Sequence, residues 1–493
     1  MASSPSSSPA TSLPSDCWLA ILEHLSPEDY WPLLFVSKDT KSLVEPFLFK
    51  KLTWDWRPIP FRRILLLFRA ILERPERAFD IHHLSLLSHQ RVQPTDFWEP
   101  PSCEQDCKEE IARFTDVLRH AQTIVQTTGF PDADSWVHAL QDGDPYALVS
   151  ILLSQLHNLR SLRLDYSFVW QSGFPGLMLR HALFSSSQSS LSRFHSLTEV
   201  DYGGNVRRDM ISGGPPEIHE EPGYPQCNPA QFPAWFYLPS LQSLAIWLRT
   251  KQDIELPERC PSLSRLRCLI LARTTIREGQ VPSLLSLCPR LKTLHLGMAY
   301  RWGKEIALQN GPAIIQGLES IRETLENLSF GVEYFPPTHC NVWLADGEKE
   351  LTTPFYRLLT RFPSLRSVEM PVNLLAGWSR APSTDLTLGL PDTIEQLCLR
   401  ADYQTVDEEG WQEKHILDLC ATNAARLRMQ LPGLKRLCVR KWSQFWSTPM
   451  IDRKRDAARA ACAQEGICLE VISDHVSNGI WTETRMCPER KVL

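Results

Sequence analysis

The chain has 493 residues, enough for one large repeat domain or for two to three ordinary domains. Its formal net charge of -5 at pH 7 gives no electrostatic reason to expect a nucleic-acid partner. No apolar run reaches the roughly 18 residues that a membrane span needs, so we expect no membrane partner. The 14 cysteines include no CxxC pair, which favours reduced thiols and a location in the cytoplasm, the nucleus or both.

The chain begins with a Ser- and Pro-rich stretch that has neither the basic region nor the apolar core of a secretory signal. We expect residues 1–11 to form a disordered tail.

Residues 13–54 contain three short helical patterns. Ser26 is placed to cap the second helix with Pro27 at its first position, and we expect Pro46 to end the third helix. Helices this short are marginal alone, so the segment is predicted to dock against another structure. In the first helix, apolar residues recur at i, i+3, i+4 and i+7: Trp18, Ile21, Leu22 and Leu25.

This segment closely resembles an F-box, from Leu13-Pro14 through the triplet Val36-Ser37-Lys38 to the expected strand at Leu52-Thr53-Trp54. The resemblance implies a three-helix module over residues 12–57. Such a module binds the adaptor subunit of an SCF-type cullin–RING ubiquitin ligase and, through it, the cullin. The residues that would contact the adaptor are Leu13, Pro14, Ile21, Leu25, Leu33, Val36 and Leu43.

One departure from the F-box pattern is Trp31-Pro32, which places a proline early in the second helix. A proline there removes a backbone donor, so we expect that helix to start late or to kink, with weaker adaptor binding. The alternative interpretation of the whole segment is an N-terminal helical cap on a larger domain.

An internal repeat with the pattern L-x-x-L-x-L occupies the rest of the chain. Alternating residues of each short strand would point inward, and one strand cannot bury its own apolar face, so neighbouring strands must stack in parallel. The first apolar positions of the nine copies are 25 to 44 residues apart: Leu159, Leu197, Leu241, Leu266, Leu291, Leu325, Leu365, Ile394 and Leu434.

This pattern predicts an irregular α/β solenoid over residues 151–475, resembling leucine-rich repeats, with parallel strands on the concave face and helices outside. Residues 58–150 would hold a helical linker and a divergent first strand near 79–87. Within that linker, Ile64, Leu67, Phe68 and Ile71 mark an amphipathic helix expected to pack the F-box against the solenoid. Cys468–Val471 is expected to be the edge strand, followed by a tail at 476–493. As a whole, the chain resembles a fungal-type F-box protein.

Outward positions of the repeat strands form a candidate recognition surface for a protein substrate. Acidic residues gather early along the chain and arginines late, so the surface could be bipolar along its length. The alternative is an ordinary solvated strand face. The candidate substrate contacts are Arg163, Asp201, Trp247, His295, Glu369, Arg400 and Arg440.

Motifs for catalysis or cofactor binding are lacking. Gly297–Glu305 resembles a phosphate loop, but its glycines have the wrong spacing and Glu305 would repel a phosphate. Cys103 and Cys107 could join His82 and His83 in a metal site, although this spacing is weak evidence. We therefore expect no catalytic residues, no metal and no cofactor.

The predicted function is substrate recognition for an SCF-type ubiquitin ligase, in which the solenoid captures an unknown protein for ubiquitin-dependent degradation. The first alternative is a non-catalytic scaffold that binds the adaptor or another partner without ubiquitination. The second is a divergent enzyme with its active site in the insertion at residues 203–237.

Overall fold

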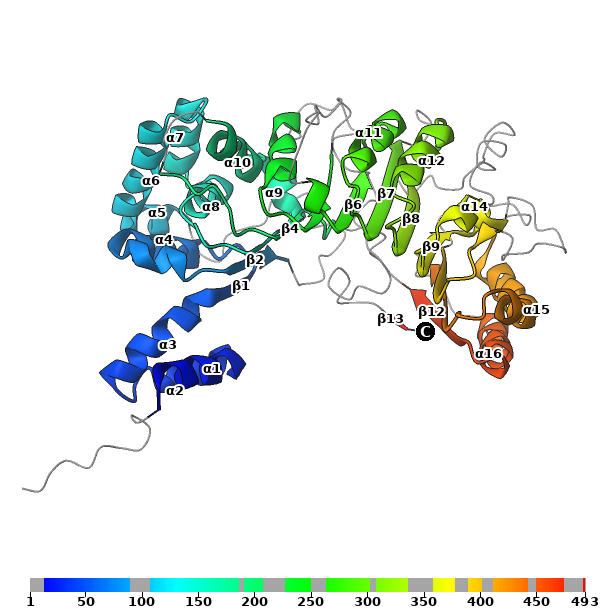
Figure 1. The fold of residues 1–493 in the computed structure, drawn as a ribbon. Coiled ribbons are helices and arrows are strands. Elements are labelled where there is room, and N and C mark those ends of the chain that lie inside the picture. The colour runs from blue at the N-terminus through cyan, green and yellow to red at the C-terminus, as the bar shows by residue number, and fades with distance from the viewer. Residues whose placement is uncertain are drawn as a thin grey trace, which may run out of the picture.

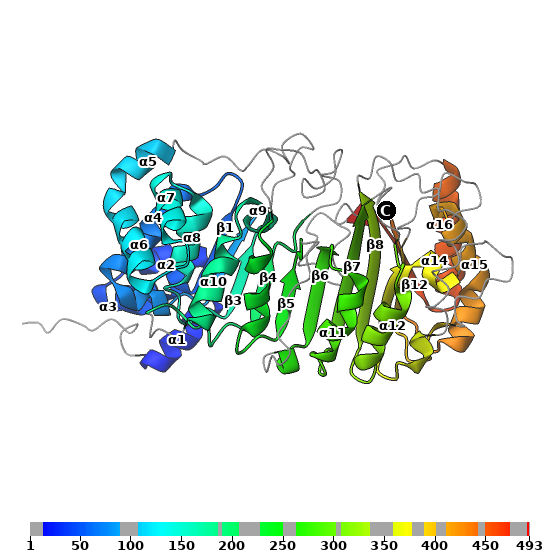
Figure 2. The same cartoon turned by 90° about the horizontal axis from the view of Figure 1, so that it is seen from above.

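A computed structural model of the chain shows a curved arch of parallel strands with helices on its outer side (Figure 1, Figure 2). The predicted tail at 1–11, and all of the predicted tail at 476–493 except two residues, lie outside the described residues. The residues that the structure describes are 13–88, 107–185, 190–206, 227–249, 263–301, 307–335, 358–376, 389–400, 411–441, 449–473 and 491–492.

Three helices begin the described chain: α1 (Ser15–His24), α2 (Pro27–Leu33) and α3 (Lys38–Lys50). The Asp29 carboxylate accepts hydrogen bonds from the Ser26 N–H at 2.9 Å and the Ser26 hydroxyl at 2.7 Å, which fixes the start of α2. The late start expected from Trp31-Pro32 is therefore wrong, and α2 instead ends one residue after Pro32.

The expectation that Pro46 ends the third helix is also wrong, because α3 continues through Pro46 to Lys50. The proline removes one backbone hydrogen bond from the helix. Phe47 and Leu48 pack against the core of the three-helix module, and Phe49 packs against the solenoid core, so burial of these side chains offsets that loss.

Strands β1 to β12 form one sheet in chain order, and each pairs in parallel with the next. This confirms the predicted α/β solenoid with parallel strands on its concave face. The strands are β1 (Lys51–Asp55), β2 (His83–Leu87), β3 (Ser161–Leu164), β4 (Glu199–Tyr202), β5 (Ser243–Ile246), β6 (Cys268–Thr274), β7 (Thr293–Arg301), β8 (Asn327–Phe335), β9 (Ser367–Pro371), β10 (Gln396–Arg400), β11 (Arg436–Lys441) and β12 (Cys468–Ser473).

The strand register explains why the repeat produces this sheet. The second apolar residue of each copy pairs with its counterpart on the next strand, as Leu162 does with Val200, so one apolar row faces the helices. The polar residues between them form rows on the concave face. In all nine copies the first apolar residue, which lies just before the strand, is fully buried in the core.

Helices and short 3-10 turns cover the convex face of the sheet (Figure 2). The helix predicted from Ile64, Leu67, Phe68 and Ile71 is α4, and these residues are buried in the solenoid core with α6 and α8. The helices after the F-box segment are α4 (Phe61–Glu73), α5 (Cys107–Arg113), α6 (Thr115–Thr128), α7 (Ala133–Gln141), α8 (Pro145–Leu153), α9 (Tyr166–Gln171), α10 (Phe174–Phe184), α11 (Val281–Ser286), α12 (Gly311–Ser320), α14 (Val372–Ala376), α15 (Glu413–Gln430) and α16 (Pro449–Gln464).

The C-terminal edge of the sheet differs from the prediction. β12 was expected to be the edge strand, but β13 (Lys491–Val492) pairs with it in antiparallel orientation. Gly297, expected in a loop after a strand, lies inside β7 instead, since β7 continues to Arg301.

Candidate functional site

The three N-terminal helices form a small core of their own, separate from the core of the solenoid. Leu22, Tyr30 and Val44 are buried at its centre. The Tyr30 hydroxyl donates a hydrogen bond to the Leu22 carbonyl at 2.8 Å, which ties α2 to α1. Because this core is small, most of the remaining apolar residues of the module stay near its surface.

The exposed apolar surface of the module, which we call the F-box face, comprises Leu13, Leu19, Ile21, Trp31, Phe35 and Val36. Phe35 is 83% exposed and Val36 is 66% exposed, a high degree of exposure for large apolar side chains. Among the residues predicted to bind the adaptor, Leu13, Pro14, Ile21 and Val36 are exposed. The other three, Leu25, Leu33 and Leu43, are half-buried against the core of the module.

Three members of the F-box face were missed from the sequence: Leu19, Trp31 and Phe35. Trp31 drew attention only through the proline that follows it. Trp31 and Phe35 are four residues apart around the end of α2, a helical spacing that could have placed them on one surface.

The F-box module joins the solenoid without a linker. Helix α3 ends at Lys50 and β1 begins at Lys51, so the last helix runs directly into the first strand. On α3, the Glu45 carboxylate forms ion pairs with Arg77 and, at 3.8 Å, with Arg74. These contacts fix the module at the β1 end of the arch (Figure 1).

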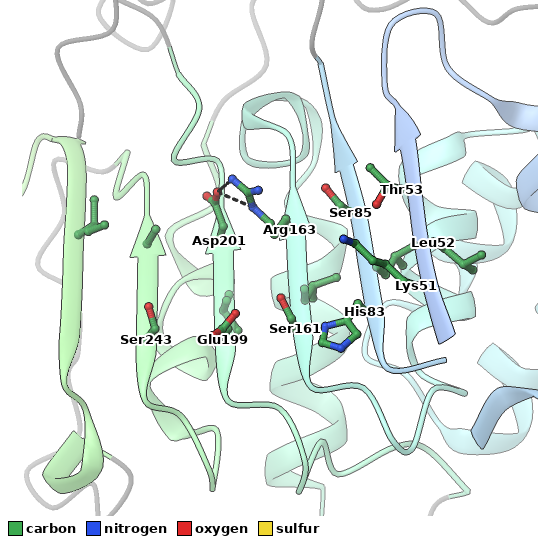
Figure 3. A pocket seen from close by; sticks show the side chains of 15 residues that line it. Lys51, Leu52, Thr53, His83, Ser85, Ser161, Arg163, Glu199, Asp201 and Ser243 are labelled. Carbon is green, nitrogen blue, oxygen red and sulfur yellow. Dashed lines mark hydrogen bonds and ion pairs between the residues drawn. The ribbon is translucent and has the colours of Figure 1, made fainter. Parts of the chain in front are cut away.

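A groove of about 360 Å³ lies on the concave face of strands β1 to β6, and we call it the proximal groove. Figure 3 shows that Arg163 and Asp201 face each other across neighbouring strands at its centre. The Arg163 Nη2 and Asp201 Oδ2 atoms are 3.3 Å apart, so these two predicted residues do come together. Its other polar side chains are Lys51, Thr53, His83, Ser85, Ser161, Glu199 and Ser243.

Burial and charge act against each other within the proximal groove. Burial raises the pKa of Asp201, and the neighbouring Arg163 guanidinium opposes that rise. Burial lowers the pKa of His83, and the negative charge of Glu199 opposes that fall while Lys51 adds to it. The pKa of His83 therefore depends on both the negative and the positive charges that line the groove.

Several groove residues were not predicted as substrate contacts, among them Lys51, Ser161, Ser243 and His83, which was considered only as a possible metal ligand. They share one register row with Glu199, because Lys51 pairs with His83 and the pairing continues strand by strand. Each of them directly precedes the inward-facing residue that starts the L-x-L-like part of its strand. That fixed offset is a signal that could have located the row.

The remaining five predicted substrate contacts lie outside the proximal groove and, like Asp201, are buried in the structure. Trp247 stacks against Trp170 with ring centroids 6.2 Å apart, at the end of β5. The other four, His295, Glu369, Arg400 and Arg440, lie towards the distal end of the arch. The structure does not present these five side chains to solvent, and any role for them in substrate binding stays a prediction.

Four of these residues and Ser329 form a polar group that we call the distal cluster: His295, Ser329, Glu369, Arg400 and Arg440. The Glu369 carboxylate accepts a hydrogen bond from the Arg400 Nη1 at 3.0 Å and another from Arg440. The His295 Nδ1 and Ser329 Oγ atoms are 2.8 Å apart. Burial, reinforced by the charge of Arg400, lowers the pKa of His295 to about 3, so the ring is neutral at pH 7.

Within the described part of the chain, no group of three or more His, Cys, Asp or Glu side chains is arranged to hold a metal ion. Cys103 of the weak metal pattern lies outside the described residues. No helix in the described ranges has both the length and the apolar character needed to cross a membrane.

Comparison with known proteins identifies one domain. The family model of the F-box domain matches residues 11–52, so the chain carries an F-box domain at the position of α1 to α3. F-box domains bind the adaptor that links them to the cullin of SCF-type ligases, which supports this role for the module. No curated protein matches the chain.

Proposed function

We propose that this protein is the substrate-recognition subunit of an SCF-type cullin–RING ubiquitin ligase. The observation that carries the proposal is an F-box domain with an exposed apolar face, joined without a linker to a solenoid with an open groove. The F-box face would bind the adaptor, and the concave face of the solenoid would bind a protein substrate.

In this proposal the chain performs no bond chemistry itself. Its contribution is proximity, because one chain that holds both adaptor and substrate raises the effective concentration of substrate lysines near the ubiquitin-loaded enzyme. The direct connection of α3 to β1 supports this role, since a rigid junction holds the substrate at a constant distance from the ligase. We place the protein in the cytoplasm, the nucleus or both, and a fungal origin and a relation to leucine-rich repeats belong to the same proposal.

Co-purification of the full chain with the adaptor and the cullin tests the proposal. We expect Phe35→Glu combined with Val36→Glu to reduce adaptor recovery at least about tenfold, because each change puts a charge into an apolar interface. Both side chains are exposed in the free chain, so the fold should survive the change. The double variant Leu13→Ala, Pro14→Ala tests the resemblance-based contacts in the same assay.

The matched control is Met429→Glu combined with Met450→Glu, which adds the same two charges at methionines that are 72% and 52% exposed on α15 and α16 of the solenoid. This control should leave adaptor recovery unchanged. Recovery of adaptor without cullin would contradict the ligase role and favour a scaffold. Recovery of neither partner would contradict adaptor binding and favour a helical cap.

A further inference from the structure

We propose that the proximal groove binds an extended polypeptide segment in which an acidic and a basic side chain are four residues apart. The acidic side chain would lie against Lys51 and the basic side chain against Glu199. Describing this segment as part of a ligase substrate rests on the proposed function, whereas the binding of the segment itself does not.

The charges that select the segment lie three strands apart in one register row. Lys51 on β1 and Glu199 on β4 are both exposed and line the groove. Between them the row contains His83 on β2 and Ser161 on β3. A segment that crosses the strands here therefore meets a positive charge first and a negative charge later.

The strand spacing fixes how far apart the two complementary charges must be. Neighbouring strands are about 4.8 Å apart, so three steps from β1 to β4 cover about 14 Å. An extended chain rises about 3.3 Å per residue, and four residues cover about 13 Å with both side chains on the same face. A spacing of four residues therefore fits the row, whereas neighbours in the chain do not.

The floor between the charged ends offers hydrogen bonds rather than further net charge. Arg163 and Asp201 neutralise each other as a pair. Hydroxyl groups of Ser85 and Ser161 line this floor and that of Ser243 lies just beyond Glu199, and each can donate and accept a hydrogen bond. Such groups can pair with the backbone N–H and C=O groups of an extended segment, which need partners when they leave water.

Beyond Glu199 the groove becomes apolar. Ala245 on β5 and Ile270 on β6 form a small apolar cluster with Cys268, and both line the groove. The segment would therefore carry an apolar side chain on the far side of its basic residue. This order of acid, base and apolar residue is defined relative to the groove, so it holds for either direction of the bound chain.

The lining favours a polypeptide over a small organic ligand. Small-molecule sites are mostly apolar and enclose most of the ligand surface. Here the side chains at the rim, Lys51, Thr53 and Glu199, are exposed, and nine of the 15 lining residues have polar or charged side chains. The groove is also open across six strands, which matches a chain laid across them.

An array of immobilised peptides of about twelve residues tests the proposal with the purified full chain. On a Gly/Ser background, the peptides vary the order of one Glu and one Lys, the spacing between them, and the presence of a Leu beyond the Lys. We expect the strongest binding at a spacing of four residues, with a further gain from the Leu. The best peptide is then measured in solution by fluorescence anisotropy.

The decisive variant exchanges the two charges, Lys51→Glu with Glu199→Lys. It should weaken binding of the best peptide roughly tenfold or more, because like charges then face each other. This variant should also bind a peptide in which Glu and Lys are interchanged more tightly than it binds the original peptide. The matched control is Lys292→Glu with Glu326→Lys, which exchanges an exposed ion pair of 2.6 Å outside the groove and should change neither result.

No selection by the array, or binding that ignores the charge exchange, would overturn the proposal. Selection at another spacing would overturn the geometry described above. Co-purification with the adaptor is measured on the same preparations. Adaptor binding without peptide selection would reject the groove and leave the proposed function intact, and peptide selection without adaptor binding would do the reverse.

Discussion

The two halves of the concave face expose the same kind of ion pair to different degrees. In the proximal groove, the side chain of Arg163 is 30% exposed and that of Asp201 is 8% exposed. In the distal cluster, the side chains of Arg400 and Glu369 are 0% and 1% exposed. All four side chains come from polar positions of the same repeat. The repeat therefore determines on which face of the sheet a side chain lies, but not how far that side chain is exposed to water.

This difference has energetic consequences. In the proximal pair the Arg163 guanidinium reaches water whereas the Asp201 carboxylate is buried, so solvent compensates only in part for the loss of one partner. A buried pair contributes little as a whole, but the loss of one partner leaves a charge without solvent. We therefore expect the distal cluster to control stability and the proximal groove to remain available for binding.

The largest expected effect is that of Glu369→Gln. This change removes the carboxylate shared by Arg400 and Arg440 and leaves two guanidinium charges in a buried site. We expect the free energy of unfolding to fall by about 3 to 5 kcal/mol, measured by chemical denaturation at pH 7.

The comparable change in the proximal groove is Arg163→Gln, which removes the half-buried partner of the buried Asp201 carboxylate. We expect a smaller loss of about 1 to 3 kcal/mol in the same measurement, because only one carboxylate loses a partner and the Gly204 N–H still donates to it at 3.0 Å. Equal losses for the two variants would show that the two halves of the concave face do not differ in the way that their burial indicates.

A second, smaller effect concerns pH. The folded pKa of His295 is about 3, against an ordinary value of 6.5, so its neutral form stabilises the fold fully above pH 6.5. As pH falls through the window from 6.5 to 3, the unfolded chain takes up a proton that the folded chain cannot. Between pH 7 and pH 5 we expect His295 to account for about 2 kcal/mol of lost stability.

Comparison of the wild type with His295→Gln isolates this contribution, because the pKa values of His82, His83 and His157 are also lowered by burial and stay in both chains. Denaturation midpoints at pH 7 and pH 5 give the measurement. The variant should lose less stability between these two values. An identical loss would mean that His295 takes up its proton in the folded protein.

A further small effect tests the geometry of the distal cluster. A Cβ at Gly331 would lie 2.6 Å from the Nη2 of Arg400, which Glu369 holds in place. Gly331→Ala should therefore displace the guanidinium and cost about 1 to 2 kcal/mol. At Gly279 the nearest atom would be 3.9 Å from the new Cβ, so Gly279→Ala should change the denaturation midpoint little. Similar shifts for both variants would contradict close packing of Arg400 over β8.

Much of the fold could be predicted because its signals are local and periodic. Ser26 and Pro27 mark the start of α2 within a few residues, and the L-x-x-L-x-L copies mark nine strands whose first apolar residues are all buried. The effects of Pro32 on the start of its helix and of Pro46 on the end of its helix were predicted wrongly, because such effects are not local. The effect of Pro46 on α3 depends on the distant side chains that pack around Phe47 and Phe49.

The candidate sites likewise contain features that the sequence predicts and features that depend on the tertiary structure. Sequence comparison placed the adaptor-binding module, and exposure in the structure then distinguished Val36 on its surface from Leu25 near its core. Arg163 and Asp201 were predicted separately, but their pairing needed the register of β3 and β4. Lys51 and His83 entered the same groove only through the stacking of β1 and β2.

By itself, the sequence determined the F-box module, the repeat and the division of each strand into an apolar and a polar face, because the spacing of neighbouring residues sets these features. Only the tertiary structure decided which polar residues meet across strands and which are removed from water. Those outcomes depend on side chains far apart in the chain, as with Glu369 and Arg440, and their burial depends on the rest of the fold. The local sequence pattern therefore does not predict which polar residues pair or how deeply they are buried.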